Sequence, residues 1–409
     1  MLDTELYKQI LGITDPWFVE NVDLKFEKET VDVFLSHKRK IKWPCPECGK
    51  MLSCRDHADE RVWRHLDTCQ LQTLLRARIP RVDCPEHGVK QVKVPWAEPK
   101  SRFTLLMERF AIKVILKCAT IKGAKEILRT SWDETWGIMN RAVKRGLVRK
   151  EQVPVHYLGI DEKAFKKGHK YMTIVSDAVN GNVQFVGETR EAGVLREYYE
   201  GLNKEQLEGI RAVAMDMWPA YISATLHCVP NASEKIVFDK FHVASHLSKA
   251  VDQVRRQEHR ELKAKEDKTL NKTRYLWLYN EDNLPDKHKP AFEELKKMDL
   301  KVAKAWAMKE DFRHFWEYLS PYHAGKFLKK WCNWAKRSGL APMKKVAETI
   351  LNHKGNLITY AKHRLTNAVA EGLNSRIMAI KRMACGFRNT EHFKTAIYFH
   401  CGGLDLDPR

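Results

Sequence analysis

Three acidic residues occupy positions suited to hold metal ions for phosphoryl transfer. Asp161 ends one apolar, strand-like run, Asp216 ends another, and Glu371 lies in a late helical segment. If the two strands share a sheet, their ends are neighbours, and a helix packed on the sheet can present the third carboxylate between them. Phosphodiester chemistry benefits from two divalent ions about 4 Å apart, and hard oxygen ligands suit Mg²⁺. We therefore predict a catalytic site in which these three residues hold two Mg²⁺ or Mn²⁺ ions.

An acid and a histidine follow a further predicted strand, in the sequence Asp239–Lys–Phe–His242. We expect them beside the carboxylates, where they would orient a metal ligand or the scissile phosphate. The alternative is a surface acid and a structural histidine. Glu162 is set aside because neighbouring residues of a strand face opposite sides of a sheet. Asp177 and Glu188 are set aside as surface acids at strand ends.

Two pairs of residues have the spacing of zinc knuckles. Cys45–Pro–Glu–Cys48 and Cys84–Pro–Glu–His87 each separate their ligands by two residues, so both side chains of a pair can reach one tetrahedral ion. The pattern predicts one structural Zn²⁺ with no open coordination position for chemistry. A set of buried reduced thiols is the alternative. The other Cys and His residues between the knuckles are not chosen as ligands: Cys54, His57, His65 and Cys69.

The charge balance points to a polyanionic partner. The 409 residues include 72 Lys and Arg against 52 Asp and Glu, a formal net charge of +20. Double-stranded DNA is the first candidate, and a solvated basic surface is the alternative. The 44% of hydrophobic residues excludes a disordered chain. Ten cysteines spread along the chain suggest a reducing compartment, and neither a membrane span nor a signal peptide is visible.

The N-terminal part is predicted to contain a hairpin region at 1–40, a zinc-binding domain at 41–98 and a helix-turn-helix DNA-binding domain at 99–152. Ser131 and Glu134 have the spacing of a capping box that begins the second helix. The buried face of the first helix is predicted to carry Phe103, Leu106, Phe110, Val114 and Ile115. Three basic residues of the second helix are predicted to contact DNA: Arg141, Lys144 and Arg145. A solvated basic helix is the alternative.

The rest of the chain is predicted to form the catalytic core. Residues 153–242 have the element order of an RNase H-like domain, with three antiparallel strands, a helix, a strand, a helix and a strand. Residues 243–360 are predicted to be an all-helical insertion, and 361–409 complete the core. The insertion's tryptophans are interpreted mostly as core, with base stacking by one of them as the less favoured interpretation. They are Trp277, Trp306, Trp316, Trp331 and Trp334. The predicted fold class is therefore multidomain α+β, with an interrupted RNase H-like α/β core.

Several strings resemble the ISL-three family of insertion-sequence transposases. The most specific is LTNAVAEGLN at 365–374, followed by IKR at 380–382 and GFRN at 386–389. Shorter matches surround the other candidate acids, with GIDE at 159–162, AMDM at 214–217 and DKFH at 239–242. The N-terminal matches are WRHLDTC at 63–69, CPEHG at 84–88 and SWD at 131–133. The resemblance extends from about residue 40 to residue 400.

The resemblance implies a DDE transposase, an enzyme with nuclease and strand-transfer activity. Asp161, Asp216 and Glu371 would hold two Mg²⁺ ions, a water would cut the 3′ end of the element, and the freed 3′-hydroxyl would attack target DNA. The zinc and helix-turn-helix domains would read the terminal inverted repeats, and the insertion would help to assemble the paired ends. Three basic residues would follow the phosphate path, with plain surface charge as their alternative: Lys381, Arg382 and Arg388. A bacterial cytoplasmic homodimer acting at the nucleoid is expected.

Two alternatives belong to other functional classes. A sequence-specific DNA-binding regulator derived from a transposase would keep the DNA-binding modules and lose an acid, yet all three acids are present. An RNase H-like nuclease or junction resolvase would share the metal site and cut without strand transfer. The long helical insertion and the two N-terminal DNA-binding modules argue against that nuclease.

Overall fold

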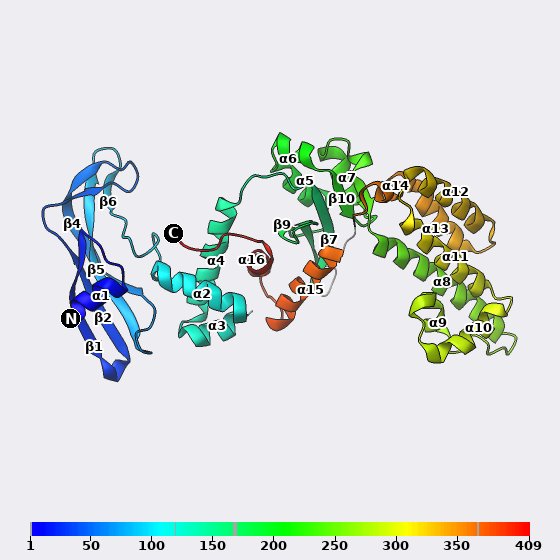
Figure 1. Cartoon of the computed structure of the whole chain (residues 1–409), viewed down its shortest axis with the longest axis horizontal. Helices are drawn as coiled ribbons and strands as arrows, with labels where there is room; N and C mark the ends of the chain where they lie inside the picture. Colours follow the sequence, from blue (N-terminus) through cyan, green and yellow to red (C-terminus); the bar gives the residue numbers. More distant parts are fainter. Residues whose placement is uncertain (1, 119, 167–169, 366–367) are drawn as a thin grey trace. The chain divides into compact units, whose positions relative to one another are not determined.

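The computed structural model describes residues 2–118, 120–166, 170–365 and 368–409 (Figure 1). The chain divides into two compact units. Unit 1 comprises Met1–Lys150, Met383–Gly386 and Leu404–Arg409, and unit 2 comprises Glu151–Arg382 and Phe387–Gly403. Of the helices in the described chain, none combines the length and apolarity needed to cross a bilayer.

Unit 1 contains a six-stranded sheet that joins the N-terminal hairpin to the zinc-binding region. The strand order is β1-β2-β5-β4-β3, with β6 paired to β5. The predicted hairpin is confirmed as β1 and β2, but β2 also pairs in parallel with β5, so the hairpin is not a separate region. One core containing Val33, Trp63 and Leu75 covers both parts of the sheet. The elements are α1 (Asp3–Ile10), β1 (Trp17–Lys25), β2 (Thr30–His37), β3 (Lys42–Pro44), β4 (Met51–Arg64), β5 (Gln72–Cys84) and β6 (Gly88–Gln91).

Three helices complete unit 1: α2 (Leu105–Cys118), α3 (Ile121–Leu128) and α4 (Trp132–Arg149). The capping box at the start of α4 is confirmed, because the Ser131 and Glu134 side chains each accept a hydrogen bond from the other residue's backbone N–H.

The predicted buried face of α2 is right only in part. Phe103 and Ile115 are buried as predicted, but Leu106 and Phe110 are exposed, and the buried stripe also carries Met107, Ala111 and Ile112. Apolar residues surround much of this helix, so its own pattern does not select one stripe. Glu108 also lies on the buried side because it forms ion pairs with α4.

Unit 2 contains a five-stranded sheet with the order β11-β10-β7-β8-β9. β7, β8 and β9 form an antiparallel meander, whereas β10 pairs in parallel with both β7 and β11. The order of strands and helices along the chain is the one expected from the sequence, except that two helices and not one lie between β9 and β10. The strands are β7 (Tyr157–Lys166), β8 (Lys170–Asp177), β9 (Val183–Gly187), β10 (Ala212–Met215) and β11 (Ile236–Phe238).

Helices α5 (Ala192–Glu200), α6 (Lys204–Gly209) and α7 (Pro219–Cys228) connect these strands, and a long helical segment follows β11. One apolar cluster continues from the sheet into that segment. Four of the five tryptophans considered above are buried there, and Trp334 is 37% exposed. The later helices are α8 (Lys240–Lys263), α9 (Arg274–Leu278), α10 (Lys289–Lys297), α11 (Lys301–Phe312), α12 (Pro321–Arg337), α13 (Ala341–Asn352), α14 (Lys354–His363), α15 (Ala368–Met383) and α16 (Thr390–Cys401).

The contact between β9 and α5 predicts an asymmetry between two glycines. A Cβ at Gly187 would lie 2.0 Å from Val194 Cγ1, whereas a Cβ at Gly193 would meet no atom within 4 Å. We expect Gly187→Ala to lower the stability of unit 2 by about 1–3 kcal/mol, because overpacking moves the helix or forces strained rotamers. Gly193→Ala is the matched control and should be neutral or slightly stabilising. Calorimetric unfolding of both variants checks the prediction, and equal effects would contradict it.

Candidate active site and metal centre

The register of unit 2's parallel strands aligns three acids at one edge of the sheet. Gly159 of β7 pairs with Ala214 of β10, so Asp161 and Asp216 each lie two residues beyond that pair. Asp216 directly follows β10 as predicted, but β7 continues to Lys166, so Asp161 lies within its strand and not at its end. Met215 pairs with Phe238 of β11, so Asp216 and Asp239 are the next residues of their chains. The backbone N–H of Asp239 donates to the Met215 carbonyl at 3.0 Å. The parallel pairing therefore brings two of the predicted catalytic acids and one predicted neighbour together.

Asp161 is held in place by groups from two elements. Its Oδ1 accepts a hydrogen bond from the Glu162 backbone N–H at 2.7 Å, and its Oδ2 accepts one from Asn374 Nδ2 of α15. Lys163 Nζ lies 3.5 Å from the same Oδ2. Further along α15, Lys381 Nζ donates to the Ala164 carbonyl at 2.8 Å. α15 therefore lies along β7, as Figure 1 also shows.

Glu371 is exposed and lies one helical turn before Asn374 on α15. Residues three apart share a helix face, so Glu371 lies on the face that contacts Asp161. Two residues of the same sequence motif, 366 and 367, lie outside the described residues. Within the described chain the three predicted catalytic carboxylates do not form a closed metal-ligand cluster; the group that does is in unit 1.

The carboxyl group of Asp216 is more buried than that of a surface acid and lies near other acidic side chains. Burial is the main cause that raises its pKa above the ordinary value, and the nearby charges of Glu162 and Asp161 add to it, whereas the Trp218 N–H and His242 act in the opposite direction. The Trp218 backbone N–H donates to Asp216 Oδ1 at 2.9 Å and orients the carboxyl group. Because a bound cation would relieve this crowding of negative charge, these oxygen donors fit a divalent metal site.

Glu162 is a site neighbour that sequence reasoning set aside. Its Oε2 lies 3.2 Å from Arg190 Nη1, whereas Asp161 is bonded to α15. The Arg190 guanidinium lies 4.5 Å from the Tyr171 ring centroid and 4.4 Å from that of Trp218. Strand alternation does send the two acids to different partners, but Glu162 still lies near enough to influence Asp216. No sequence signal indicated this, because it depends on where α7 begins in space.

Asp239 and His242 lie at the same edge of the sheet. Asp239 is buried and caps α8, its Oδ1 accepting the Phe241 N–H at 3.1 Å. His242 Nε2 lies 3.8 Å from Asp239 Oδ2. The other set-aside acids have different surroundings. Asp177 accepts hydrogen bonds from the turn at Val179 and Asn180, and Glu188 is exposed.

The predicted zinc ligands converge at one point of unit 1. The ligand atoms of Cys45, Cys48, Cys84 and His87 all lie within 4.8 Å of one another. Cys48 Sγ is 3.8 Å from Cys84 Sγ, which is 3.5 Å from His87 Nδ1. A tetrahedral ion with Zn–S bonds of about 2.3 Å and Zn–N bonds of about 2.0–2.1 Å requires edges of about 3.8 and about 3.5 Å. The four side chains therefore fit one Zn²⁺.

The other Cys and His residues of this region have different surroundings. Cys54 Sγ donates to the Asp56 carbonyl, and Cys69 is exposed. His57 Nε2 lies 2.8 Å from His37 Nε2. His65 is buried against Thr104, and burial lowers its pKa to about 4. The paired spacing in the sequence thus distinguished the clustered residues from these four.

The basic residues predicted to contact DNA differ in how far they are already engaged. Arg141 Nε donates to Glu108 Oε1 at 3.0 Å. The Arg145 side chain is 8% exposed and bonds Glu98, Glu108 and the Leu406 carbonyl. Three others are exposed, and Lys381 binds the β7 backbone. The exposed ones are Lys144, Arg382 and Arg388. Contact with DNA stays a prediction for all six, and Arg145 also fastens α4 to the C-terminal segment.

Comparison with known proteins identifies the family. The transposase model of the ISL3 family matches residues 158–397, more than half of the chain. The chain belongs to the ISL3 family of transposases. Two further models match this ISL3 transposase: the zinc-finger of transposase IS204/IS1001/IS1096/IS1165 at 41–87, and the helix-turn-helix domain of transposase family ISL3 at 92–143.

Two curated relatives align with this ISL3 transposase over nearly their full lengths. The transposase for insertion sequence element IS1001 of Bordetella parapertussis is 26% identical over 399 residues, which are 96% of this chain and 97% of the relative. The transposase for insertion sequence element IS1557 of Mycobacterium tuberculosis is 24% identical over 424 residues, covering 96% and 94%.

The ligand geometry predicts how zinc content responds to single cysteine changes. We expect Cys48→Ser to lose most of the bound zinc and to destabilise unit 1, because the ligand set falls to three. Cys69→Ser is the control, since Cys69 is exposed and outside the cluster. Zinc measured by mass spectrometry after dialysis checks this. Full zinc in Cys48→Ser, or zinc loss in Cys69→Ser, would contradict the assignment.

Substitutions of two neighbouring basic residues of α4 should have different effects on DNA binding and on stability. Lys144→Gln should leave stability within about 0.5 kcal/mol of the wild type, weaken binding to all DNA sequences and lower the salt slope by about one. Arg145→Gln should cost about 1–3 kcal/mol, because it leaves buried Glu108 and the Leu406 carbonyl short of a donor. Thermal unfolding and DNA titrations at several salt concentrations check both. Equal stability of the two variants would contradict the division.

Proposed function

We propose that this protein is the transposase of an insertion sequence: it binds the terminal inverted repeats, cuts the element ends by metal-assisted phosphodiester hydrolysis and joins the 3′-OH to target DNA. The observation that carries the proposal is the register that places Asp161 beside Asp216, with α15 bonded to Asp161 one turn from Glu371. In this proposal the sheet of unit 2 is an RNase H-like core, and α8–α14 are a helical insertion in it. The two relatives, each a transposase for an insertion sequence element, support the proposal.

The proposed chemistry uses Asp161, Asp216 and Glu371 as ligands for two Mg²⁺ or Mn²⁺ ions. When bound, such ions activate a water and stabilise the leaving oxygen of the phosphodiester. The chain's own contribution is orientation: Asn374 holds one oxygen of Asp161, and the Trp218 N–H holds one oxygen of Asp216. Asp239 and His242 would position these ligands or the scissile phosphate from the next strand.

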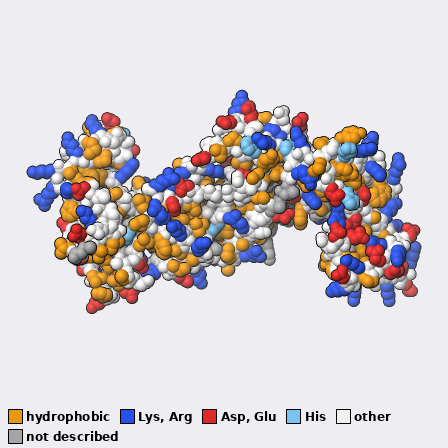
Figure 2. Space-filling model, viewed as in Figure 1, with side chains coloured by type: hydrophobic (Ala, Val, Ile, Leu, Met, Phe, Trp, Pro, Cys, Tyr) orange, Lys and Arg blue, Asp and Glu red, His pale blue; other side chains and the backbone are white. Residues whose placement is uncertain are grey.

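DNA recognition in this proposal is divided between the two units. The zinc ribbon and the helix-turn-helix would read the terminal repeats, and the basic residues of α15 and the following loop would lie along the phosphates. The net charge of +20 supports a polyanionic partner, and Figure 2 shows Lys and Arg side chains over the visible face of both units. We further propose a homodimer, since two ends must be cut in concert, acting in the bacterial cytoplasm at the nucleoid.

A cleavage and strand-transfer assay tests the proposed function. The substrates are the element's own end duplex with flanking DNA and a supercoiled target plasmid, in Mg²⁺. The intact protein should nick at the element terminus and join the 3′ end to the plasmid. Glu371→Gln should bind the same duplex about equally well and cut more than about 100-fold more slowly, because it removes a charged metal ligand of similar shape.

The matched control is Glu348→Gln, which makes the same chemical change at an exposed position of α13. It should cut and join like the intact protein. Binding without cutting by the intact protein would favour a DNA-binding regulator derived from a transposase. Cutting without joining would favour an RNase H-like nuclease or junction resolvase. Equal activity of Glu371→Gln and the intact protein would remove Glu371 from the site.

A further inference from the structure

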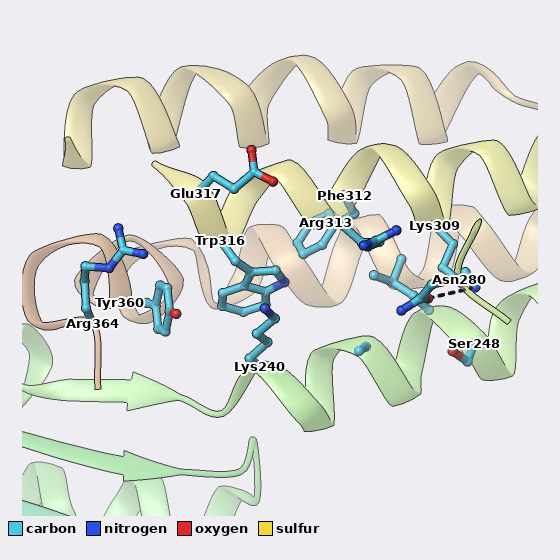
Figure 3. Close-up of a pocket in the computed structure, with 12 residues that line it drawn as sticks. Lys240, Ser248, Asn280, Lys309, Phe312, Arg313, Trp316, Glu317, Tyr360 and Arg364 are labelled. Carbon is cyan, nitrogen blue, oxygen red and sulfur yellow. Dashed lines mark hydrogen bonds between the residues drawn. The ribbon is translucent and has the colours of Figure 1, made fainter. Parts of the chain in front are cut away.

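A cavity of about 410 Å³ lies between helices of the segment that follows β11 (Figure 3). Its walls come from α8, from the end of α11 with the short helix η5 (Arg313–Glu317), and from α14. This volume is within the range of about 300–1,000 Å³ that is usual for sites of single small ligands. The lining includes four cationic side chains, Lys240, Lys309, Arg313 and Arg364, against one acid, Glu317.

Two of the four cations are already engaged by the protein. Lys309 Nζ donates to the Tyr279 carbonyl at 2.7 Å, and Arg313 Nη1 donates to Glu310 Oε2 at 2.7 Å. Lys240 and Arg364 are different, because both are exposed and neither side chain has a hydrogen bond or ion pair with any described residue. The cavity thus has two cations available for an anionic ligand.

The wall beside these two cations is aromatic. Trp316 and Tyr360 are almost fully buried, and their rings meet edge to face with centroids 4.8 Å apart. Neither the Trp316 indole N–H nor the Tyr360 hydroxyl has a hydrogen-bond partner among the described side chains and backbone. Figure 3 shows the two rings side by side, with Lys240 reaching toward Trp316 and Arg364 beyond Tyr360. This wall therefore offers an aromatic surface, two hydrogen-bond donors and two positive charges.

The two cations of the cavity are neighbours in sequence of residues at the candidate active site. Lys240 directly follows Asp239, which is level with Asp216 in the strand register. Arg364 is the C-cap residue of α14 and lies seven residues before Glu371. Both cations are thus close in sequence to residues of the candidate active site.

We propose that this cavity receives one unpaired nucleotide of the element-end DNA, with its base against Trp316 and Tyr360 and its phosphate between Lys240 and Arg364. This inference rests on the proposed function and adds to it a subsite outside the three acids. Aromatic side chains hold bases of any identity by stacking, and Lys and Arg hold the backbone phosphate. Glu317 is the single acid among the lining residues, and its Oε2 lies 3.2 Å from His314 Nδ1, so cations outnumber acids in the lining.

The test compares binding of two element-end duplexes that differ only in whether one base near the cleavage site is paired. Extruding a base costs least when it is already unpaired, so a protein that captures a nucleotide should bind the mismatched duplex more tightly. The Glu371→Gln protein is used throughout, so that binding is measured without cutting. We expect the mismatch at one position to lower the Kd by about 10-fold.

Variants of the cavity should abolish that gain. Lys240→Gln combined with Arg364→Gln changes two exposed residues and should bind paired and mismatched duplexes alike. Trp316→Phe should lose part of the gain and serves as a second probe of the aromatic wall. Lys249→Gln is the matched control, because Lys249 is an exposed residue of the same helix α8 outside the cavity. This variant should bind both duplexes slightly more weakly and leave the ratio of their two Kd values unchanged.

Two results would overturn the proposal: equal binding of the paired duplex and of every mismatched duplex by the Glu371→Gln protein, or a gain that persists in the Lys240→Gln, Arg364→Gln variant. Equal binding would leave the cleavage assay of the intact protein unaffected. Conversely, a failure of the proposed transposase function would appear there as absent cutting, while the ratio of the two Kd values could still be measured.

Discussion

The parallel pairing of β10 with both of its neighbours is the constraint on which the candidate active site depends. Residues at equal register in adjacent parallel strands lie side by side, so Asp161, Asp216 and Asp239 meet at one edge of the sheet. Everything else at the site attaches to this edge. α15 is fastened to it by Asn374, and α8 starts from it with Asp239 as its cap. A shift of one residue in either pairing would turn one acid to the other face.

The electrostatic balance of that edge explains why its acids need partners. Burial and neighbouring carboxylates raise the pKa of Asp216, because both make the ionised form of its carboxyl group less favourable. Arg190, between two aromatic rings, offsets Glu162, and His242 offsets part of the rest. The remaining negative charge suits divalent cations.

Much of the fold, the zinc-ligand cluster and the acids of the candidate active site could be predicted from local sequence. The zinc ligands were recognisable because a knuckle is a local structure: two residues between ligands bring both side chains to one ion. The strands around Asp161 and Asp216 were recognisable because each is a short apolar run ending in an acid. The α2 face was predicted only in part because its apolar residues surround the helix, and the Glu108 ion pairs with α4 belong to the side that is buried. Glu162 was set aside for a related reason, since strand alternation does not tell how near α7 brings Asp216.

The sequence by itself determined the core strands that lead to the three acids' edge, the zinc ligand set and the choice of the three candidate acids, because each depends on residue type and spacing within a few positions. Only the tertiary structure decided that the N-terminal hairpin joins the zinc-binding strands in one sheet and that Arg145 is engaged inside unit 1. It also decided that Lys240, Arg364, Trp316 and Tyr360 line one cavity. These residues come from three segments that are far apart in the chain, and burial and partner choice depend on contacts between distant segments that no local pattern encodes.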